Sequence, residues 1–594
     1  MSFLKTFFAS FLGILIALGT LVGVTAITLA VWGAAKGNDG ASGIAYNSVL
    51  KITLAQPIPE LTDNKAQSGT AAFDLSSSST PGLRAILKAL EFAKTDDKIK
   101  GIYLDLAPVP MGAATRSALR AGLLDFKKSG KFIMAYSTRY SQGSYYLASV
   151  ADRVYLHPKG ALEWAGVAAQ IPFFKVMFDK VGVKAQVYYA GKFKSATESF
   201  RRTEMSPENK LQVREYLEAN YQGLLTDIGV SRKIPYEKLR EWANTYVIRT
   251  ANDALTRGMV DGLRYKDEVL TELRTRLALE RKDAIPVVSL AQYTAAHEED
   301  NGGGKAKIAV VYAEGDISEG RSEGGSIGGD TYADLLRKLR EDDDTKAIVL
   351  RINSGGGSSL ASEIIWREVA LCRKAGKTVV VSMGDVAASG GYYIACDANT
   401  IVAEPNTITG SIGVFGIIPN VGGLLRDKLG ITFDTLKTGK YAVAASGNVY
   451  FEFGEEEGKI IQGMVDTTYA DFLGRVAKGR KMTVAQVDSM AQGRVWTGRK
   501  ALQLGLVDTL GGLQAAIYSA AKIAKLNKYK LVHLPETENS LQHLFSTLKP
   551  DPTKAAATVM REQMGEDLYA QFVMMQQIRT MRGVQMRLPF LPVY

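Results

Sequence analysis

The stretch GDVAASGGYYIACDAN at residues 384–399 decides the fold, because a degraded copy of it, TRYSQGSYYLASVADR, stands at 138–153. Both copies keep a tyrosine pair, but Gln142 occupies the position that Ser389 holds in the other copy. The offset between these two residues is 247 positions (389 − 142). Segments repeated at a long, constant offset indicate that a whole folding unit has been duplicated.

Two further segments recur in the same order at nearly the same offset. DDKIKGIYLDL at 96–106 returns as DDTKAIVLRI at 343–352, and ANDALTRGMVDGL at 251–263 returns as GRKALQLGLVDTL at 498–510. Around them, β-branched runs such as AIVLRI and TVVVSMG alternate with helical patterns such as ASEIIWREVALCRKAG. This alternation predicts an α/β fold with a layered parallel sheet in each half.

The copies also divide the chain into parts. The segment HEEDNGGGKAK is charged and rich in glycine, which predicts a linker between the halves. The tail has no counterpart in the first half, and its Met-rich segment MREQMGEDLYAQFVMMQQIRTM predicts an amphipathic interaction helix. We therefore expect a tip and anchor at 1–36, a first repeat at 45–296, a linker at 297–307, a second repeat at 308–535 and an extension at 536–594.

The anchor is predicted from residues 6–35, which carry no charge. A helix of that length crosses the ~30 Å hydrocarbon core of a bilayer, whereas the apolar part of a secretory signal is usually only about 7–15 residues long. A cleaved signal is the alternative, since Gly33-Ala34-Ala35 resembles a cleavage site. We expect a single-pass protein of the inner membrane with its bulk on the periplasmic side, in contact with membrane lipid.

Composition and charge exclude several classes of protein. With 46% hydrophobic and 22% charged residues, the chain is not a disordered protein. Its net charge of +11 is spread along the sequence without an arginine-rich run, so no nucleic acid partner is expected. Cys372 and Cys396 lie among apolar residues and are predicted to be buried. No histidine lies near Ser389, which disfavours a Ser-His-Asp triad, although His157 remains open.

Ser389 follows a predicted buried strand and precedes a helical run, so we expect it in an exposed position at a helix N-terminus. Backbone N–H groups and the helix dipole stabilise negative charge there, as a nucleophilic serine requires. The alternative is a serine that only caps the helix. A second glycine turn, RINSGGGSS at 351–359, predicts oxyanion donors at Gly356 and Gly390. The competing phosphate-loop motif GxxxxGK[ST] is absent from the sequence.

Four motifs together resemble the long, duplicated form of the signal peptide peptidase A family over about residues 45–530: MGDVAASGGYYIA, RINSGGGS, ITGSIGVFG and AGKFKSATESF. The resemblance implies a tandem Clp protease/crotonase-like fold after one transmembrane helix. It implies that Ser389 is the nucleophile, Lys194 the general base and Ser411 a serine that orients the lysine. It further implies hydrophobic peptide substrates such as cleaved signal peptides, no metal or organic cofactor, and a homotetramer.

A lysine base must be neutral, but a free lysine has a pKa near 10.4. We expect burial beside Phe193 and Phe200, together with nearby cations such as Lys192, to lower the pKa of Lys194. In the second half the motif GKFKSA aligns with GKYAVA, so Ala442 stands where Lys194 does. Each half has therefore lost a different part of the site, and one complete site is expected at the interface between the halves.

The chain departs from the family pattern at one position. Two alternative functions also stay open. Gly355 replaces the proline that usually follows Arg-Ile-Asn-Ser in this family, which weakens the oxyanion assignment of Gly356. A crotonase-like acyl-CoA enzyme would use the same glycine turns without a serine nucleophile. A non-catalytic membrane scaffold would keep the fold and the oligomer without needing the dyad.

Overall fold

The structure is a computed structural model of the 594-residue chain. Its described residues are 44–54, 56–61, 81–297, 302–323, 325–445, 447–535 and 584–588, with single positions at Thr20, Met560, Gln563, Gly565 and Tyr569. The predicted anchor, apart from Thr20, and most of the predicted C-terminal helix lie outside them. Within the described ranges, no helix is both long and apolar enough to span a bilayer.

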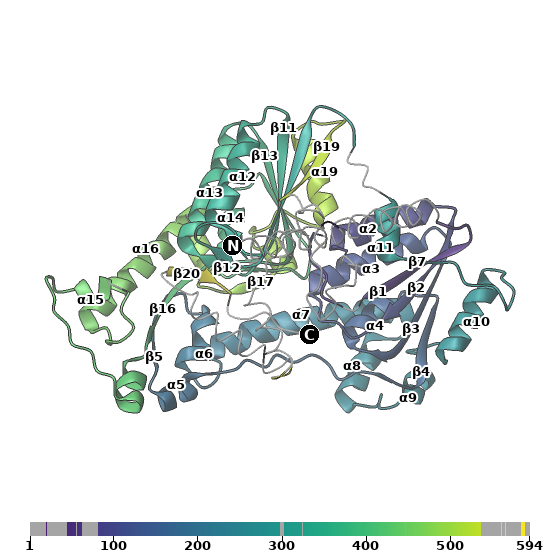
Figure 1. The fold of residues 1–594 in the computed structure, drawn as a ribbon, viewed down its shortest axis with the longest axis horizontal. Helices are drawn as coiled ribbons and strands as arrows, with labels where there is room; N and C mark the ends of the chain where they lie inside the picture. Colours follow the sequence, from purple (N-terminus) through teal and green to yellow (C-terminus); the bar gives the residue numbers. More distant parts are fainter. Residues whose placement is uncertain are drawn as a thin grey trace, which may run out of the picture.

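One parallel sheet is built from the first half of the chain (Figure 1). Its strand order is β6-β4-β3-β2-β1-β7. The strands are β1 (Ser48–Leu54), β2 (Ile99–Leu106), β3 (Phe132–Tyr140), β4 (Arg153–Leu162), β6 (Gly262–Leu263) and β7 (Val287–Ser289). The helices of this half are α2 (Leu83–Thr95), α3 (Ala113–Lys127), α4 (Gln142–Ala148), α8 (Tyr236–Thr245), α9 (Ala251–Thr256), α10 (Lys266–Arg276) and α11 (Leu290–Ala296).

A second sheet is built from the second half, in the order β17-β15-β13-β11-β8-β19, with β14 paired to β13 and β18 paired to β14. The strands are β8 (Lys307–Glu314), β11 (Thr345–Ser354), β13 (Thr378–Ala388), β14 (Thr400–Ala403), β15 (Ile408–Gly410), β17 (Val495–Thr497), β18 (Thr509–Leu510) and β19 (Lys530–Leu534). Its helices are α12 (Gly329–Glu341), α13 (Ser359–Lys374), α14 (Gly390–Ala395), α17 (Val484–Met490), α18 (Gly498–Gln503) and α19 (Leu513–Ile523).

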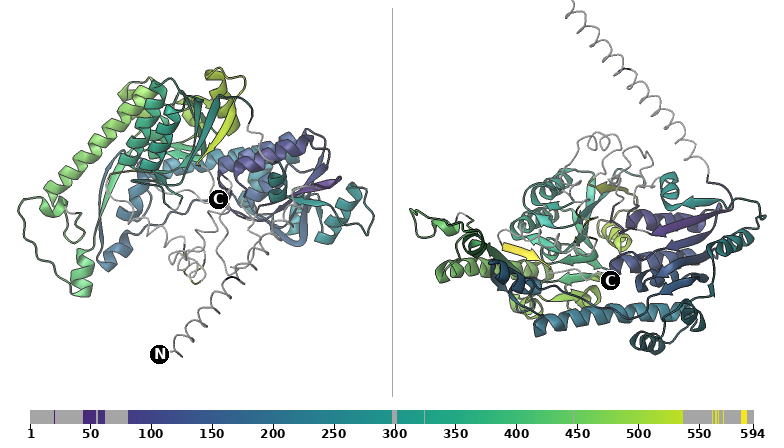
Figure 2. Two further views of the ribbon diagram at one scale, coloured as in Figure 1. Left: turned by 45° about the horizontal axis from the view of Figure 1, so that its top comes forward. Right: turned by 60° about the horizontal axis from the view of Figure 1, so that its bottom comes forward.

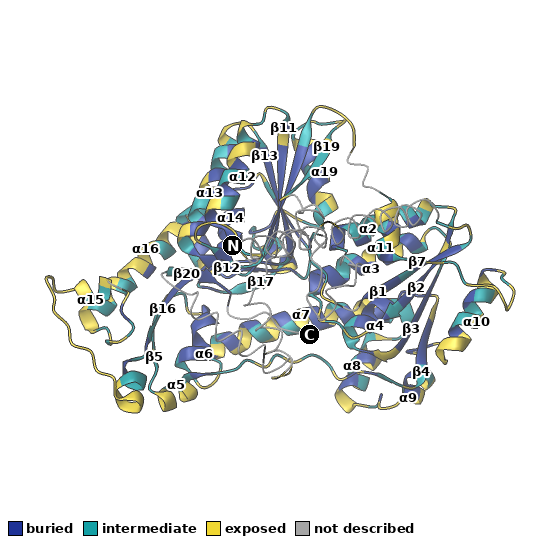
Figure 3. Cartoon of the chain, in the orientation of Figure 1, coloured by how far each residue is buried: buried dark blue, intermediate teal, exposed yellow. Residues whose placement is uncertain are grey.

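The α/β prediction is confirmed, and the repeated segments occupy equivalent places. Strand β2 pairs with β1 and β3, as β11 pairs with β8 and β13. Figure 1 shows α12, α13 and α14 on one face of the second sheet and α19 on the other. Because helices cover both faces, the run from Ala347 to Ile352 is apolar at nearly every position, with Arg351 the exception. Figure 3 shows this sheet as a buried core.

A third sheet mixes segments that are far apart in the chain, in the order β10-β9-β12-β20-β16-β5. It contains β5 (Lys184–Ala190) of the first half and β20 (Val584–Arg587) of the C-terminal extension. The remaining strands come from the second half: β9 (Ile317–Ser318), β10 (Ile327–Gly328), β12 (Gly356–Ser358) and β16 (Val414–Asn420). Strand β5 pairs with all seven residues of β16 in antiparallel register. The first half therefore adds the edge strand to a sheet that also contains the glycine turn at Gly356, with β16 and β20 between them.

Helix α7 (Pro207–Arg232) joins the two halves from below, as Figures 1 and 2 show. It begins at Pro207, where the Ser206 side chain accepts a hydrogen bond from the Asn209 amide. Near its start, Gln212 accepts a hydrogen bond from the Val495 amide of the second half. Towards its end, Asp227 accepts one from Tyr146 of the first half. The elements α5 (Lys175–Val181), α6 (Glu198–Arg201), α15 (Ala442–Ala445) and α16 (Glu455–Arg480) complete the fold around β5 and β16.

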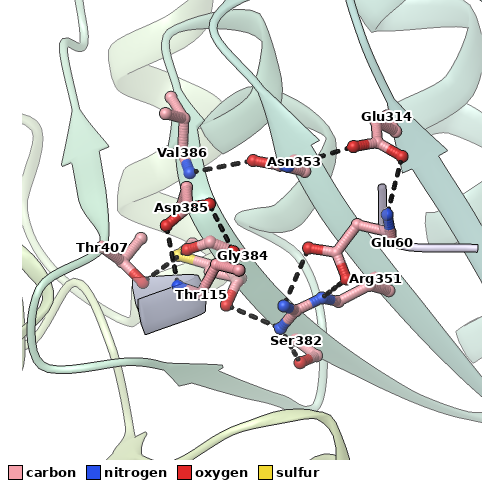
Figure 4. Close-up of polar contacts among 11 residues, drawn as sticks. Glu60, Thr115, Glu314, Arg351, Asn353, Ser382, Gly384, Asp385, Val386 and Thr407 are labelled. Atoms are coloured by element: carbon pink, nitrogen blue, oxygen red, sulfur yellow. Dashed lines mark hydrogen bonds and ion pairs between the residues drawn. The ribbon is translucent and has the colours of Figure 1, made fainter. Parts of the chain in front are cut away.

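A buried polar network also links the halves (Figure 4). Arg351 on β11 donates two hydrogen bonds, of 2.8 and 2.9 Å, to the carboxylate of Glu60. The backbone N–H of Glu60 donates to Glu314. On strand β13, Asp385 accepts a hydrogen bond of 2.9 Å from the backbone N–H of Thr115. The network therefore fixes the end of β13, where Ser389 follows, against the first half.

Candidate active site

Three polar side chains from both halves meet inside the protein. Lys194 Nζ lies 2.7 Å from Ser389 Oγ, 3.0 Å from Ser411 Oγ and 3.0 Å from the Ser411 carbonyl oxygen. None of the three residues is more than 1% exposed. Lys194 and Ser389 are 195 residues apart in the sequence. The structure thus brings together the three side chains that the sequence analysis selected.

Ser389 is held by backbone conformation as well as by hydrogen bonds. It stands between β13 and α14 with φ 56° and ψ −117°, a sparsely populated conformation for a residue with a side chain. Its N–H donates to the Gly410 carbonyl at 2.8 Å, which ties it to the residue before Ser411. Its side chain makes no cap hydrogen bond, so the alternative of a purely capping serine is wrong.

The expected exposure of Ser389 is also wrong. Its side chain is fully buried. Lys194 contacts its hydroxyl, and the residue before it, Ala388, belongs to a buried apolar cluster that includes Leu588 of the C-terminal extension. The sequence places the serine at the end of a strand, but it does not show which distant segments cover that end.

Burial is what lowers the pKa of Lys194 well below its usual value of 10.5. The sequence analysis expected help from neighbouring cations, but the structure gives desolvation as the cause. Lys192 is exposed, with its Nζ over the Phe193 ring at 5.5 Å. Two neighbouring lysines therefore stand in opposite environments, and burial favours the neutral form of the amine at Lys194.

The sequence analysis missed Gln212, which fixes the loop that carries Lys194. On α7, its Nε2 donates to the Phe193 carbonyl at 3.1 Å and to Ser195 Oγ at 2.9 Å. Its Oε1 accepts from the Val495 amide at 3.2 Å, which connects that loop to the second half. In the sequence, Gln212 is recognisable only as a polar residue on a helix face. Exposed glutamines have the same pattern, so the sequence does not identify its role.

Backbone contacts reinforce the same connection. The Phe193 N–H donates to the Gln492 carbonyl at 2.8 Å, and the Ser411 N–H donates to the Arg494 carbonyl at 2.7 Å. The segment 492–495 therefore holds the lysine loop and the Ser411 loop together. A change in either loop moves the amine relative to the hydroxyl.

The two glycines predicted as oxyanion donors lie next to each other. Gly390 begins α14, so its N–H has no partner within the helix. Gly356 has φ 97°, and a Cβ on it would lie 2.6 Å from the Gly390 nitrogen. Its N–H donates to Ser354 Oγ at 3.1 Å. Gly355 does not have positive φ, and its carbonyl accepts from the Leu588 N–H at 2.7 Å. The donor roles of Gly356 and Gly390 stay predictions.

In the other repeat, the positions that correspond to Ser389 and Lys194 are Gln142 and Ala442, and their surroundings differ from those of the site. Gln142 begins α4 and exchanges two hydrogen bonds with the backbone of Gly166. Ala442 begins α15 and is exposed. The ring of His157 packs edge-on against Tyr265, and its Nδ1 accepts a bond from the Lys159 amide. The lysine, and not this histidine, is the basic group at Ser389.

Comparison with known proteins gives the family. A model of peptidase family S49 matches residues 125–280 and 372–527, one match in each half. The chain belongs to peptidase family S49. Protease 4 of Salmonella typhi is 37% identical, over 78% of this chain and 75% of its own length. Protease 4 of Haemophilus influenzae is 31% identical, over 92% of this chain and 90% of its own length.

A plant relative supports the same family assignment. The chloroplastic serine protease SPPA of Arabidopsis thaliana is 34% identical, over 85% of this chain and 73% of its own length. This S49 member is therefore a serine protease with a duplicated α/β unit. A ClpP1 mutant from Listeria monocytogenes aligns over 35% of the chain at 15% identity, with a TM-score of 0.23. At that score the Clp/crotonase-like architecture stays a prediction.

Proposed function

We propose that this protein cleaves peptide bonds with a dyad in which Ser389 is the nucleophile and Lys194 is the general base. The observation that carries the proposal is the 2.7 Å contact between Lys194 Nζ and Ser389 Oγ inside a fully buried site. A neutral amine has two N–H groups and one lone pair. The two oxygen atoms of Ser411 accept the N–H groups, and the lone pair then faces the Ser389 hydroxyl.

The reaction follows from this arrangement. Ser389 Oγ attacks the peptide carbonyl as its proton passes to Lys194 Nζ, and backbone donors near Gly390 stabilise the oxyanion. The lysine then gives that proton to the departing amine, which leaves an ester between Ser389 and the acyl part. Water, deprotonated by the same lysine, hydrolyses the ester and restores the serine.

The proposal extends to location and substrate. We assign hydrophobic peptides, such as cleaved signal peptides, as substrates, and a tetramer anchored in the inner membrane with its site on the periplasmic side. The uncharged span at residues 6–35 supports the anchor, and the relatives named protease 4 support a protease. Neither an acyl-CoA enzyme nor a scaffold requires a buried lysine in contact with a serine, so neither explains the site.

Mass spectrometry of the intact chain tests the dyad. A peptidyl phosphonate should add once, at Ser389, and Ser389→Ala should take no adduct and hydrolyse no peptide. The matched control is Ser199→Ala, which removes a buried hydroxyl that bonds to none of the described residues and should still take the adduct at Ser389. Labelling elsewhere, or hydrolysis by Ser389→Ala, would show that the reaction does not use this serine.

A further inference from the structure

Strand β20 occupies a slot one strand wide beside the candidate site. On one side it pairs antiparallel with β12, with Gly356 opposite Arg587 and Ser358 opposite Gln585. On the other side it pairs antiparallel with β16, where Phe415 lies opposite Gln585. Figure 1 shows β20 next to β12 and β16. Without β20, these two strands would present unpaired edges to each other, a geometry that accepts an extended peptide.

The same strand lies against the two predicted oxyanion glycines. A Cβ on Gly356 would lie 2.0 Å from the Met586 carbonyl oxygen, and one on Gly390 would lie 3.1 Å from it. Only glycines allow a backbone to approach this closely. One residue further along, the Leu588 N–H donates to the Gly355 carbonyl. The backbone of 584–588 therefore follows the glycine turn that precedes the reacting groups.

The side chain of Leu588 fills an apolar pocket next to the nucleophile. Its neighbours are Tyr216 on α7, Val386 and Ala388 on β13, and Ile408 on β15. Ala388 directly precedes Ser389. Leu588 is 7% exposed and Met586 is 1% exposed. The residues of 584–588 nearest the nucleophile are thus apolar, as expected of a peptide held in this groove.

Two polar side-chain contacts connect this strand to described residues of the second half. Ser359 Oγ donates to the Val584 carbonyl at 2.9 Å, and Arg587 forms an ion pair of 2.9 Å with Asp316. The hydrogen bond from the Leu588 N–H to the Gly355 carbonyl involves only backbone atoms. A groove that holds its ligand chiefly by backbone pairing accepts many sequences, which suits a protease of broad specificity.

We propose that β20 is the chain's own ligand for the peptide-binding groove and must leave before a substrate enters. The inference rests on the proposed function, because it takes the groove beside Ser389 as the substrate site. It accounts for a nucleophile that is fully buried. Release of 584–588 removes Leu588 from the pocket beside Ala388 and frees the edges of β12 and β16.

Kinetics of a short apolar peptide substrate test the displacement. Leu588→Asp places a charge in the apolar pocket and should unseat the strand in the full chain. Because the groove is then open for a larger fraction of the time, KM should fall at least about fivefold with kcat unchanged. Leu124→Asp is the matched control, since Leu124 is 41% exposed on α3, and KM should stay the same. An unchanged KM in Leu588→Asp would overturn the proposal.

Peptide binding gives a second measurement that does not need catalysis. A dye-labelled peptide GVQMRLPF, the sequence of 583–590, should bind a chain shortened to residue 583 and compete with substrate. It should bind the full chain much more weakly, and its variant with aspartate for leucine should bind neither. Equal binding to both chains, or no binding to the shortened one, would make β20 a fixed strand of the sheet. Failure of phosphonate labelling in every variant would instead contradict the dyad, whatever the peptide does.

Discussion

Lys194 and Lys192, which are separated by one residue, show how far the environments of two nearby lysines can differ. One is fully buried against two serines, and the other is exposed over a phenyl ring. Sequence alone selected Lys194 through its motif, because both lysines have the same basic neighbours. What sequence could not supply was the burial that lowers the pKa of the Lys194 amine, since the covering segments come from distant parts of the chain.

At this scale we expect Lys194→Ala to reduce kcat/KM by about 10²–10⁴-fold, the usual contribution of a general base. Lys194→Arg should be as inactive, because a guanidinium stays protonated at any working pH. Lys192→Ala is the matched control and should keep most of the activity. Steady-state kinetics on a peptide substrate checks all three, and loss of activity in Lys192→Ala alone would move the base to the other lysine.

Stability should also depend on pH through Lys194. Its pKa is lowered in the folded state, so between the folded and unfolded pKa values only the unfolded chain binds the proton. Lowering the pH through that window therefore favours unfolding. Lys194→Met removes the effect. As the pH falls from above 10, the Tm of the variant should rise relative to the Tm of the wild type. Thermal melts at several pH values would show this change.

At the scale of elements, α7 contributes to the site without reaching the nucleophile. Its Gln212 holds the Lys194 loop, while its far end contacts the first half. The helix itself is predictable from sequence, because Ser206-Pro207 is a strong start signal. The role of Gln212 is not predictable, because it depends on the Val495 amide, which lies 283 residues later.

We expect Gln212→Met, which keeps the length of the side chain and loses its hydrogen bonds, to loosen the lysine loop. Water then reaches Lys194, its pKa rises towards the free value, and the rise of kcat/KM with pH moves to higher pH. Asn220→Leu is the matched control, since Asn220 is also buried on α7 but, among the described residues, donates its side-chain hydrogen bond to the Tyr216 carbonyl of the same helix. A pH–rate profile that is the same in Gln212→Met as in the wild type would leave this residue a purely structural role.

At the scale of the molecule, the duplication predicted two sheets, and each is built from one half. The third sheet was not predictable, because β5 of the first half pairs with β16 of the second half and β20 comes from the C-terminal extension. Likewise, the pairing of Arg351 with Glu60 joins residues 291 positions apart. Periodicity in the sequence predicts which residues are buried, but it does not predict which distant segment packs against them.

The buried ion pair between Glu60 and Arg351 should contribute much of the free energy that holds the two halves together. Glu60→Gln leaves the Arg351 charge buried without its partner, and we expect a loss of about 3–5 kcal/mol in the free energy of unfolding. Glu452→Gln is the matched control. The Lys184–Glu452 pair also measures 2.8 Å and joins the halves, but it is exposed, so its loss should cost about 0–1 kcal/mol. Denaturant unfolding of both variants tests the contrast, and equal losses would contradict it.

Because Lys194 and Ser389 lie in different halves, the ribosome makes them at different times. The site is complete only after the second of them has been made. The ribosome makes Lys194 first, and 195 residues follow before Ser389 exists. At about 5–20 residues per second, this interval lasts roughly 10–40 s. During it the nascent chain carries Lys194 without Ser389, so by the proposed mechanism it cannot cut itself or other proteins.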